Sequence, residues 1–367
     1  MSARVLLAPV TVTPTKPLTP SHVKGLLWLD VMYRATRLCA DVDFQYSLST
    51  YNATAQTLGF WEYLDRVHPE VDYRDHDEAD IGALYVRYQA DGFRAPFAAL
   101  RPYLAAVEAT GWVHPASARL VEIWRGHYAH LGMHDPGLGD FRPPPMGHEE
   151  TIERLCARGI CLDGRRQGGA VYLDLTRFGQ PLRRIATADD QANYLLLALR
   201  ELVGKVEAYD EIVLIHDREL TEDFELLRRA VDALGGSAVR VAVDRVPIDG
   251  VVKSSRHGGW EGATLPAILA DCPADDPAAL RLGLRVYFLA QLGKDRTQSF
   301  RADLLRGALK RARKLLGAAQ PSLVDVAGFV AGHRGENRHV DPYRLTSGLL
   351  AKHRNPPVRA VAEAVYC

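Results

Sequence analysis

An apolar run, a proline-rich loop and a helical pattern follow one another at the start of the chain, and this order constrains the fold most. Residues 5–12 (VLLAPVTV) are apolar and short enough for a buried parallel strand. After the prolines of the loop, apolar residues recur at helical spacing, which predicts a helix that begins near Ser21. The N-terminus of such a helix offers free N–H groups and a partial positive charge to a phosphate. His22 and Lys24 lie in its first turn, so we predict an anion site there.

The segment KPLTPSH (residues 16–22) resembles the first signature of the class I aminoacyl-tRNA synthetases, most closely of their arginyl and cysteinyl branches. In that family a lysine, a proline and a leucine can precede His-x-Gly-His, and an aspartate follows on the helix. Here the lysine, proline and leucine stand at 16–18, residues 19–22 fill the signature, and Asp30 falls at the position of the aspartate.

The resemblance implies that ATP, with Mg²⁺, binds at this turn. His22 and Thr19 would then be catalytic groups, and Ser21 and Lys24 would contact the nucleotide. Two positions depart from the family pattern. Thr19 replaces the first histidine, as related nucleotidylyltransferases also tolerate, and Ser21 replaces the glycine against which adenine packs.

The composition is that of an ordinary globular protein, with 47% hydrophobic and 25% charged residues. Its 45 basic and 45 acidic residues cancel, so no overall positive field favours nucleic acid as the main partner. A DNA partner is not expected, and tRNA is a possible one. Five cysteines are too few and too scattered for a disulfide framework, so a cytoplasmic protein is expected. No apolar run approaches the roughly 20 residues that span a bilayer, so no membrane partner is expected.

The 367 residues divide into three regions by pattern. Residues 53–149 are mostly helical by pattern and end in a proline- and glycine-rich stretch, in the place where class I synthetases carry a connective insertion. Residues 1–52 and 150–262 alternate strands and helices, as a nucleotide-binding domain does. We therefore predict an α/β fold, a doubly wound parallel (Rossmann-like, HUP-type) sheet that is split by the helical insertion. A C-terminal helical region, resembling the stem-contact part of the family, is expected over 263–367.

Periodicity predicts the individual elements. Before and within the insertion we expect a strand over 42–48 and helices over 58–67, 79–88, 97–110 and 116–131. After it we expect a strand within 168–179, a helix over 190–205, a buried strand over 211–216, a helix over 221–234 and a strand within 237–246. Helices follow within 264–272, 276–292 and 299–317, with one or two more from residue 321 onward.

A basic loop flanked by glycines, VVKSSRHGG (residues 251–259), follows the last predicted strand. Its place resembles that of the Lys-Met-Ser-Lys-Ser loop of class I synthetases, which an Asp-Pro-x-Ala-Leu-Arg segment also follows. The resemblance implies that Lys253 and Arg256 are catalytic cations and that Ser255 contacts the nucleotide. Cations on a glycine-hinged loop suit the negative charge of a pentavalent phosphate transition state. The alternative is an ordinary solvated turn.

His216 and Asp217 end the predicted strand EIVLIH. The carboxyl ends of parallel strands line the crevice in which ligands bind. Related enzymes have a Gly-Ala-Asp element there, which implies that Asp217 holds the ribose hydroxyls and that His216 adjoins the nucleotide. The alternative is that Asp217 caps the start of a helix.

The amino-acid pocket is predicted from two segments. The second strand offers Gln45, Ser47 and Ser49, and ATADDQANYL offers Asp189, Asp190, Asn193 and Tyr194. In the arginyl branch a tyrosine and acidic residues before the second-half strands select the guanidinium, and we favour Tyr194 over the two aspartates as a substrate contact. Helix capping, surface exposure or, for the tyrosine, burial in the core is the alternative.

Two further clusters have simpler explanations. His127, His130 and His134 share one helical face, but no cysteine or carboxylate stands beside them at a zinc spacing, so no metal site is expected. Residues 301–316 are basic on one side. We expect an amphipathic helix that packs under the basic loop with this side in solvent, and contact with an RNA backbone is the alternative.

The residues after Leu316 are too few for an anticodon-binding bundle, so no decoding is expected. We hypothesise an ATP-dependent ligase that forms an aminoacyl-adenylate and passes the amino acid to a small-molecule, peptide or carrier acceptor. One alternative is a transferase that uses ready-made aminoacyl-tRNA and has lost ATP use, motivated by the altered signature. Another is a non-catalytic protein that binds tRNA or a true synthetase.

Overall fold

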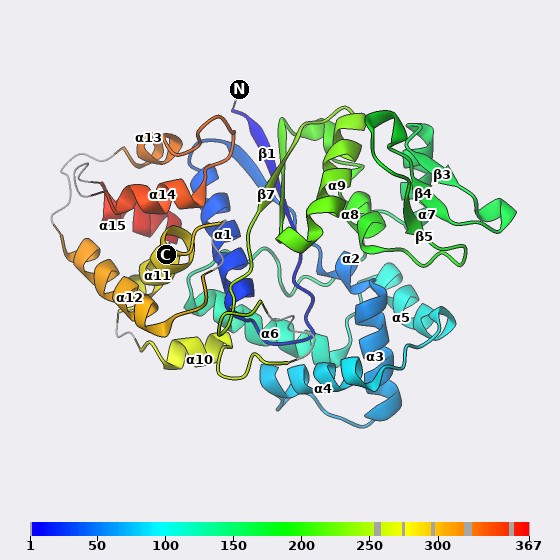
Figure 1. Ribbon diagram of the computed structural model, residues 1–367, viewed down its shortest axis with the longest axis horizontal. Coiled ribbons are helices and arrows are strands. Elements are labelled where there is room, and N and C mark those ends of the chain that lie inside the picture. The colour runs from blue at the N-terminus through cyan, green and yellow to red at the C-terminus, as the bar shows by residue number, and fades with distance from the viewer. Residues whose placement is uncertain are drawn as a thin grey trace.

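The computed structural model describes residues 2–252, 258–273, 276–294, 298–318, 325–351 and 356–366. Its central feature is a sheet of four parallel strands in the order β2-β1-β6-β7 (Figure 1). The strands are β1 (Arg4–Pro9), β2 (Asp41–Phe44), β6 (Glu211–His216) and β7 (Ala238–Ala242). The predicted mixed α/β class with a parallel sheet is therefore confirmed.

β6 is the most deeply buried strand, because β1 and β7 pair with its two edges and apolar layers cover its faces. All six of its residues are buried. Its pairing with β1 runs from Val5 opposite Glu211 to Pro9 opposite Ile215. The strand expected over 211–216 is confirmed. α1 (Pro20–Thr36) connects β1 to β2, and α9 (Thr221–Ala233) connects β6 to β7.

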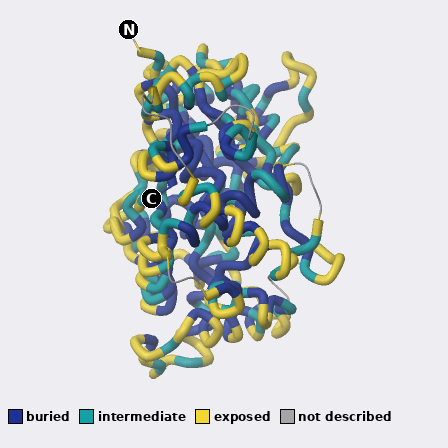
Figure 2. The backbone as a smooth tube through the Cα atoms, turned by 90° about the vertical axis from the view of Figure 1, so that its left-hand side faces the viewer, coloured by how far each residue is buried: buried dark blue, intermediate teal, exposed yellow. Residues whose placement is uncertain are grey.

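Alternation along the strands divides the hydrophobic core into two layers, because successive side chains point to opposite faces of a sheet. Val5 and Leu7 of β1 pack in one cluster with α1 and the C-terminal helices. Leu6 and Ala8 pack in the other cluster with helices of the segment between β2 and β6. In Figure 2 the buried residues fill the centre of the molecule and the exposed residues its outer side.

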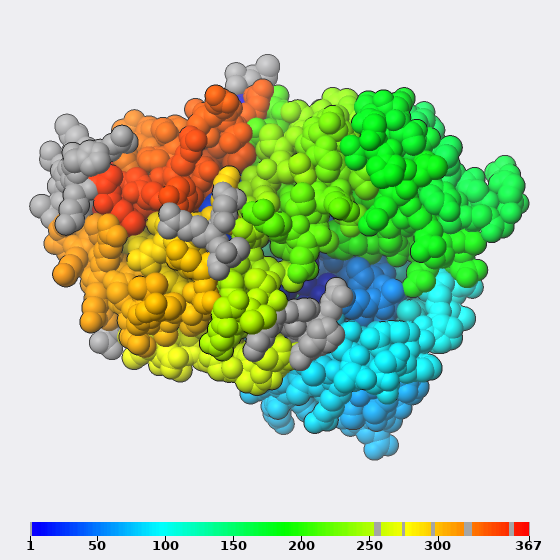
Figure 3. Space-filling model, viewed as in Figure 1, coloured from blue at the N-terminus to red at the C-terminus, as the bar shows by residue number. Residues whose placement is uncertain are grey.

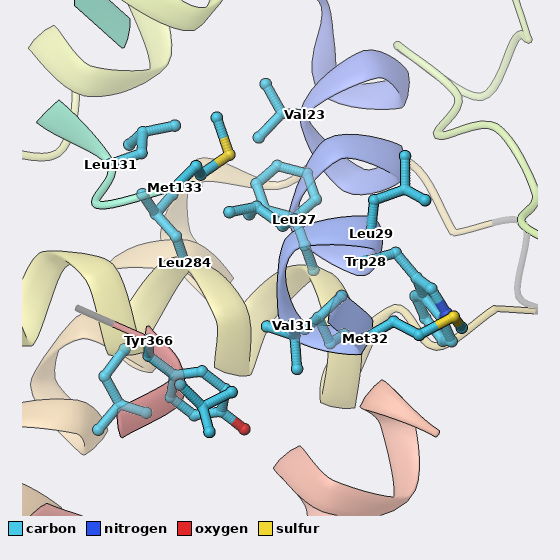
Figure 4. Packing of buried hydrophobic residues seen from close by; sticks show 14 of the residues in the cluster. Val23, Leu27, Trp28, Leu29, Val31, Met32, Leu131, Met133, Leu284 and Tyr366 are labelled. Atoms are coloured by element: carbon cyan, nitrogen blue, oxygen red, sulfur yellow. The ribbon is translucent and has the colours of Figure 1, made fainter. Parts of the chain in front are cut away.

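α1 is fixed by the C-terminal part of the chain. Its first residue is Pro20, a favourable position because the N–H that proline lacks has no partner within the helix. Its buried apolar residues include Val23, Leu27 and Val31, which Figure 4 shows on the ribbon that faces Leu284 and Tyr366. α1 contacts both η6 (Val286–Gln291) and η8 (Ala362–Tyr366). The turn that carries His22 therefore depends on segments far away in the sequence.

The segment between β2 and β6 contains helices and a second sheet. The helices are α2 (Leu48–Asn52), α3 (Ala55–Val67), α4 (Glu78–Asp91), α5 (Phe97–Thr110), α6 (Pro115–His130), α7 (His148–Ala157) and α8 (Tyr194–Leu202). The helical pattern predicted for residues 53–149 is confirmed. The second sheet is antiparallel, with the order β3-β4-β5, and consists of β3 (Cys161–Asp163), β4 (Val171–Leu173) and β5 (Arg183–Ala186). Only one strand was predicted here, because strands of three or four residues show too little alternation.

The part after β7 is helical. It contains α10 (Leu265–Ala270), α11 (Pro277–Arg285), η6, α12 (Ala302–Gly317), α13 (Val326–Ala331), α14 (Pro342–Leu349), α15 (Val358–Val361) and η8. The one or two helices predicted from residue 321 onward were too few, because α13, α14 and α15 are too short for clear periodicity. Asp325 and Asp341 cap the first two of them by accepting backbone N–H groups. No helix within the described ranges is long and apolar enough to cross a membrane.

Candidate functional site

A cavity of about 1170 Å³ lies where the carboxyl ends of β1, β6 and β7 meet the N-terminus of α1. Its other wall comes from the start of α3, from β4 and β5, and from the start of α8. In Figure 3 the dark blue N-terminal segment is visible in a hollow near the centre of the face, between green and cyan segments. Ligands of parallel α/β sheets bind at this edge. The volume exceeds the roughly 300–1,000 Å³ typical of small-molecule sites, so two substrates can share it.

Thr19 and His22 lie together on the cavity wall at the first turn of α1. The His22 Nδ1 accepts the backbone N–H of Thr19 at 3.1 Å, and the Thr19 hydroxyl lies 3.1 Å from the same nitrogen. Because a backbone N–H can only donate, the proton of the neutral ring is on Nε2. Burial, together with the positive charges of Lys16 and Arg245, lowers the pKa of His22 to about 3. At neutral pH His22 therefore brings an uncharged N–H donor to this wall.

Ser21 also lines the cavity, but its hydroxyl is bound to the segment after β7. The Ser21 Oγ accepts the backbone N–H of Val246 at 2.9 Å and donates to the Val246 carbonyl at 3.3 Å. These bonds fasten the N-terminus of α1 next to Arg245. The serine that replaces the family's glycine thus joins two walls of the site.

Lys24 does not line the cavity, contrary to the prediction from its place in the first turn. The α1 residues that do are Ser21, His22, Gly25, Leu26 and Leu29. Lys24 falls outside this face, because each helical residue turns the side chain by about 100°, and it is fully buried. Lys16 supplies the cation instead. It lines the cavity, is largely buried and lies 5.2 Å from the centre of the Tyr85 ring.

Asp217 lines the cavity at the end of β6, and both of its carboxylate oxygens already have partners. One oxygen accepts the backbone N–H of Glu219 at 2.9 Å and so caps the 3-10 turn Arg218–Leu220. The other binds Arg245 Nη2 at 2.9 Å, and Arg245 also binds the Glu219 carboxylate at 2.7 Å. The structure thus contains the helix cap that the sequence left as the alternative. A ribose that used this carboxylate would compete with Arg245.

His216 lines the cavity at the end of β6, and one of its ring nitrogens is buried. Its side chain is 3% exposed and stacks on Phe224, with the ring centres 4.6 Å apart. Nδ1 donates to the Asp217 carbonyl at 2.8 Å, so Nε2 is the unprotonated nitrogen of the neutral ring. Burial lowers the pKa of His216, and Nε2 has no hydrogen-bond partner within the described part of the chain.

Asn193 and Tyr194 line the opposite wall, where α8 begins. The helix predicted from residue 190 begins at Tyr194, because Asn193 is its cap: Oδ1 accepts the backbone N–H of Leu196 at 3.1 Å. Tyr194 stacks on Tyr51 with ring centres 5.2 Å apart. Burial and the neighbouring Tyr51 raise the pKa of Tyr194, so its hydroxyl is neutral. The structure therefore brings Tyr194 into the same cavity as the first turn of α1.

Gln45 and Ser47 do not line this cavity, and the prediction that they reach it is corrected. They lie on a separate small cavity. β2 ends at Phe44, before the predicted residue 48, because the Ser47 Oγ accepts the backbone N–H of Thr50 at 3.2 Å and starts α2. The Gln45 amide donates to the buried Glu201 carboxylate at 2.7 Å.

Asp189 and Asp190 lie outside the cavity lining, in the turn before α8. Both are exposed, and Asp190 binds Arg165 at 2.5 Å. The two acidic residues that the sequence offered for a substrate guanidinium are therefore on the surface.

His127, His130 and His134 do not converge on one point. The His127 Nε2 lies 3.3 Å from the Glu78 carboxylate, whereas His134 stacks on Tyr33 at 4.4 Å. Among the residues that the structure describes, no three His, Cys, Asp or Glu side chains are placed to hold a metal ion.

The basic segment 301–316 forms α12, which is amphipathic as predicted. Its buried side consists of Leu305, Ala308, Leu309 and Ala312. This side packs chiefly on α11, and the lysines and arginines of the other side are exposed. The basic side is therefore solvated in the isolated chain.

Lys253, Ser255 and Arg256 lie outside the described residues, together with Ser254 and His257. The described chain stops at residue 252 and resumes at residue 258. Their role at the phosphates stays a prediction.

Arg245 is the main cavity residue that sequence reasoning missed. It follows β7 at the carboxyl edge of the sheet, so the rule that selected Asp217 after β6 also selects Arg245. Arg183 and Arg184 were missed as well, because they come from β5, whose strand pattern is too short to detect.

No family model matches this sequence, and no curated protein sequence matches it significantly. Solved structures do match. The arginyl-tRNA synthetase of Thermus thermophilus is similar over 100% of this chain and 75% of its own, with a TM-score of 0.66 and 14% identity. That of Plasmodium falciparum is similar over 99% of this chain and 68% of its own, with a TM-score of 0.56 and 10% identity. At such identities the likeness concerns the fold. The chain therefore has the fold of a class I aminoacyl-tRNA synthetase-like core.

Proposed function

We propose that this protein is an ATP-dependent ligase that forms an aminoacyl-adenylate and passes the amino acid to a small-molecule, peptide or carrier acceptor. One observation carries the proposal. The signature turn with Thr19 and His22, and the end of β6 with His216 and Asp217, line the same cavity of about 1170 Å³. The synthetase-like fold is consistent with this chemistry.

The proposal assigns residues 1–52 and 150–262 to a nucleotide-binding domain, 53–149 to a connective insertion and 263–367 to a C-terminal helical region. The sheet order supports the division. β1 and β6 are neighbours in the sheet although the insertion separates them in the chain.

The charges of the cavity fit a triphosphate. The lining contains the cationic side chains of Lys16, Arg183, Arg184 and Arg245. It contains two carboxylates, Asp217 and Glu219, so positive charge is in excess among the described lining residues. Mg²⁺ would arrive on the nucleotide, since this ion keeps waters and phosphate oxygens as ligands and needs few from the protein.

In the proposed first step a carboxylate oxygen of the amino acid bonds to the α-phosphorus of ATP, and the bond to the pyrophosphate oxygen breaks. The Nε2–H group of His22, the Thr19 hydroxyl and the free N–H groups at the N-terminus of α1 would donate to phosphate oxygens. Lys253 and Arg256 are the predicted cations for the departing pyrophosphate. In the second step an amine or hydroxyl of the acceptor attacks the acyl carbon and AMP leaves.

Exchange of labelled pyrophosphate into ATP, measured with a panel of amino acids, tests the proposal. We expect exchange with at least one amino acid and at least a hundredfold loss in the His22→Ala variant, because the variant lacks the donor at Nε2. The substitution His130→Ala, at an exposed histidine far along the chain, is the matched control. Absence of exchange with every amino acid would contradict the proposal.

A transferase that takes its acyl group from ready-made aminoacyl-tRNA is a second candidate. The observation that favours it is the Ser21 hydroxyl, bound to Val246 at the position where the family has glycine. Such an enzyme would lose its activity after RNase treatment and would not respond to ATP. The ligase would show the opposite pattern in both assays.

A further inference from the structure

We propose that the amino acid activated in this cavity has no cationic side chain, so that arginine and lysine are not substrates. This inference rests on the proposed ligase function and names its substrate class. The proposed substrate class excludes arginine, the amino acid in the names of the two matched synthetases.

The first argument is that the cavity has no carboxylate left for a cationic side chain. Asp217 and Glu219 are the only carboxylates of the described lining, and Arg245 binds both, at 2.9 and 2.7 Å. A guanidinium in the cavity would therefore lie unpaired beside other cations. Burying an unpaired charge is strongly unfavourable.

The acidic residues near the cavity are also engaged. Asp223 binds Arg183 at 2.8 Å. The Glu201 carboxylate faces the separate small cavity and accepts from Gln45. Asp190, which the sequence offered for a guanidinium, binds Arg165 on the surface. These three carboxylates are therefore not available to select a cation in the cavity.

The second argument is charge balance. The described lining has four cations and two carboxylates, and its two histidines are neutral at pH 7, which leaves two positive charges among the described residues. ATP with one Mg²⁺ carries about two negative charges near neutral pH, as the metal offsets half the charge of the triphosphate. The zwitterionic backbone of an amino acid adds none. A basic side chain would therefore add positive charge that nothing in the described lining balances, and Lys253 and Arg256, the cations predicted at the pyrophosphate, would add more.

The third argument is that the polar groups left at the walls are neutral. The Tyr194 hydroxyl, which burial keeps neutral, belongs to a lining residue at the start of α8. Gln191 lines the same side. Such groups recognise hydroxyl, amide or aromatic N–H groups, which uncharged side chains carry.

Binding of non-hydrolysable aminoacyl-sulfamoyl-adenosines tests the inference. Calorimetry would compare the arginyl, lysyl, glutamyl and aspartyl compounds with a panel of uncharged ones on the full chain. We expect the best uncharged compound to bind at least tenfold more tightly than the arginyl and lysyl compounds. Tightest binding of the arginyl or lysyl compound, or pyrophosphate exchange with arginine alone, would overturn the inference and leave the ligase function standing. No binding and no exchange with any amino acid would contradict the ligase function and the inference together.

A variant tests the role of Arg245 directly. Arg245→Met releases the Asp217 and Glu219 carboxylates, so the affinity for the arginyl compound should rise at least tenfold relative to the best uncharged one. The matched control is Arg228→Met, which also frees carboxylates of its own ion pairs but lies on α9 outside the cavity lining. An unchanged affinity ratio in Arg245→Met would refute this role. Arg245→Gln, which keeps hydrogen-bonding groups, serves if the methionine variant does not fold.

Discussion

Replacing Asp30 by alanine should destabilise the protein strongly, because this carboxylate joins α1 to the C-terminal helices. Asp30 is 4% exposed and accepts from Arg34 Nε at 2.9 Å, from the backbone N–H of His134 at 2.8 Å and from Arg285 Nη2 at 2.6 Å. Arg285 is fully buried. The substitution leaves its guanidinium without a counter-charge. Breaking one side of a buried ion pair costs about 3–5 kcal/mol.

Urea denaturation followed by tryptophan fluorescence measures this effect as a change in the free energy of unfolding at unchanged denaturant slope. The control is Glu207→Ala, which removes a surface ion pair with Arg158. The side chain of Arg158 is 51% exposed and that of Glu207 is 74% exposed. That pair should contribute about 0–1 kcal/mol. The double variant Asp30→Leu with Arg285→Met should lie within about 1 kcal/mol of the parent, since apolar pairs replace buried ion pairs well. A loss below about 1 kcal/mol in Asp30→Ala would refute the reasoning.

Two further predictions concern acid stability and helix packing. The pKa of His22 is lowered from 6.5 in the unfolded chain to about 3 in the folded protein. As the pH drops below 6.5, His22 takes up a proton in the unfolded chain but not in the folded protein, so the free energy of unfolding falls. Between pH 7 and 5 the free energy of unfolding of the parent should fall by about 2 kcal/mol more than that of His22→Asn. The control His130→Asn should lose as much as the parent. Equal losses in all three proteins would contradict the prediction. Gly283→Ala should lower stability by about 1–3 kcal/mol, because its Cβ would lie 2.5 Å from Leu309 Cδ2. Gly307→Ala should raise stability by about 0.5–1 kcal/mol, because no other atom lies within 4 Å of the added Cβ. Urea denaturation of both variants measures these changes in the free energy of unfolding.

The parallel sheet and α1 were predictable because their patterns are long or strongly apolar. The strand EIVLIH is apolar in the middle and ends at a helix signal, so its bounds follow from the sequence. The insertion helices could also be predicted, since each repeats its apolar residues over several turns. The small sheet β3-β4-β5 could not, because its strands are short and two of them carry exposed polar residues.

Several residues that line the cavity could be predicted from the sequence, but the hydrogen bonds and ion pairs that they make could not. Chain order alone places His22 and Asp217 at one edge of the sheet, where the structure has them. The ion pair that occupies Asp217 joins residues 28 positions apart and depends on the path of the chain after β7. The prediction that Lys24 lines the cavity was wrong for a simpler reason. Its place in the first turn fixes its height on α1, whereas the direction of its side chain depends on which helix face packs inward.

The central claim is that the first turn of α1 and the end of β6 hold the same nucleotide. The most direct test is a crystal structure of the protein with a non-hydrolysable ATP analogue. We predict the phosphates within hydrogen-bonding distance of His22 Nε2 and the nucleoside in contact with His216. An analogue bound elsewhere on the chain, or phosphates directed away from the N-terminus of α1, would contradict the account.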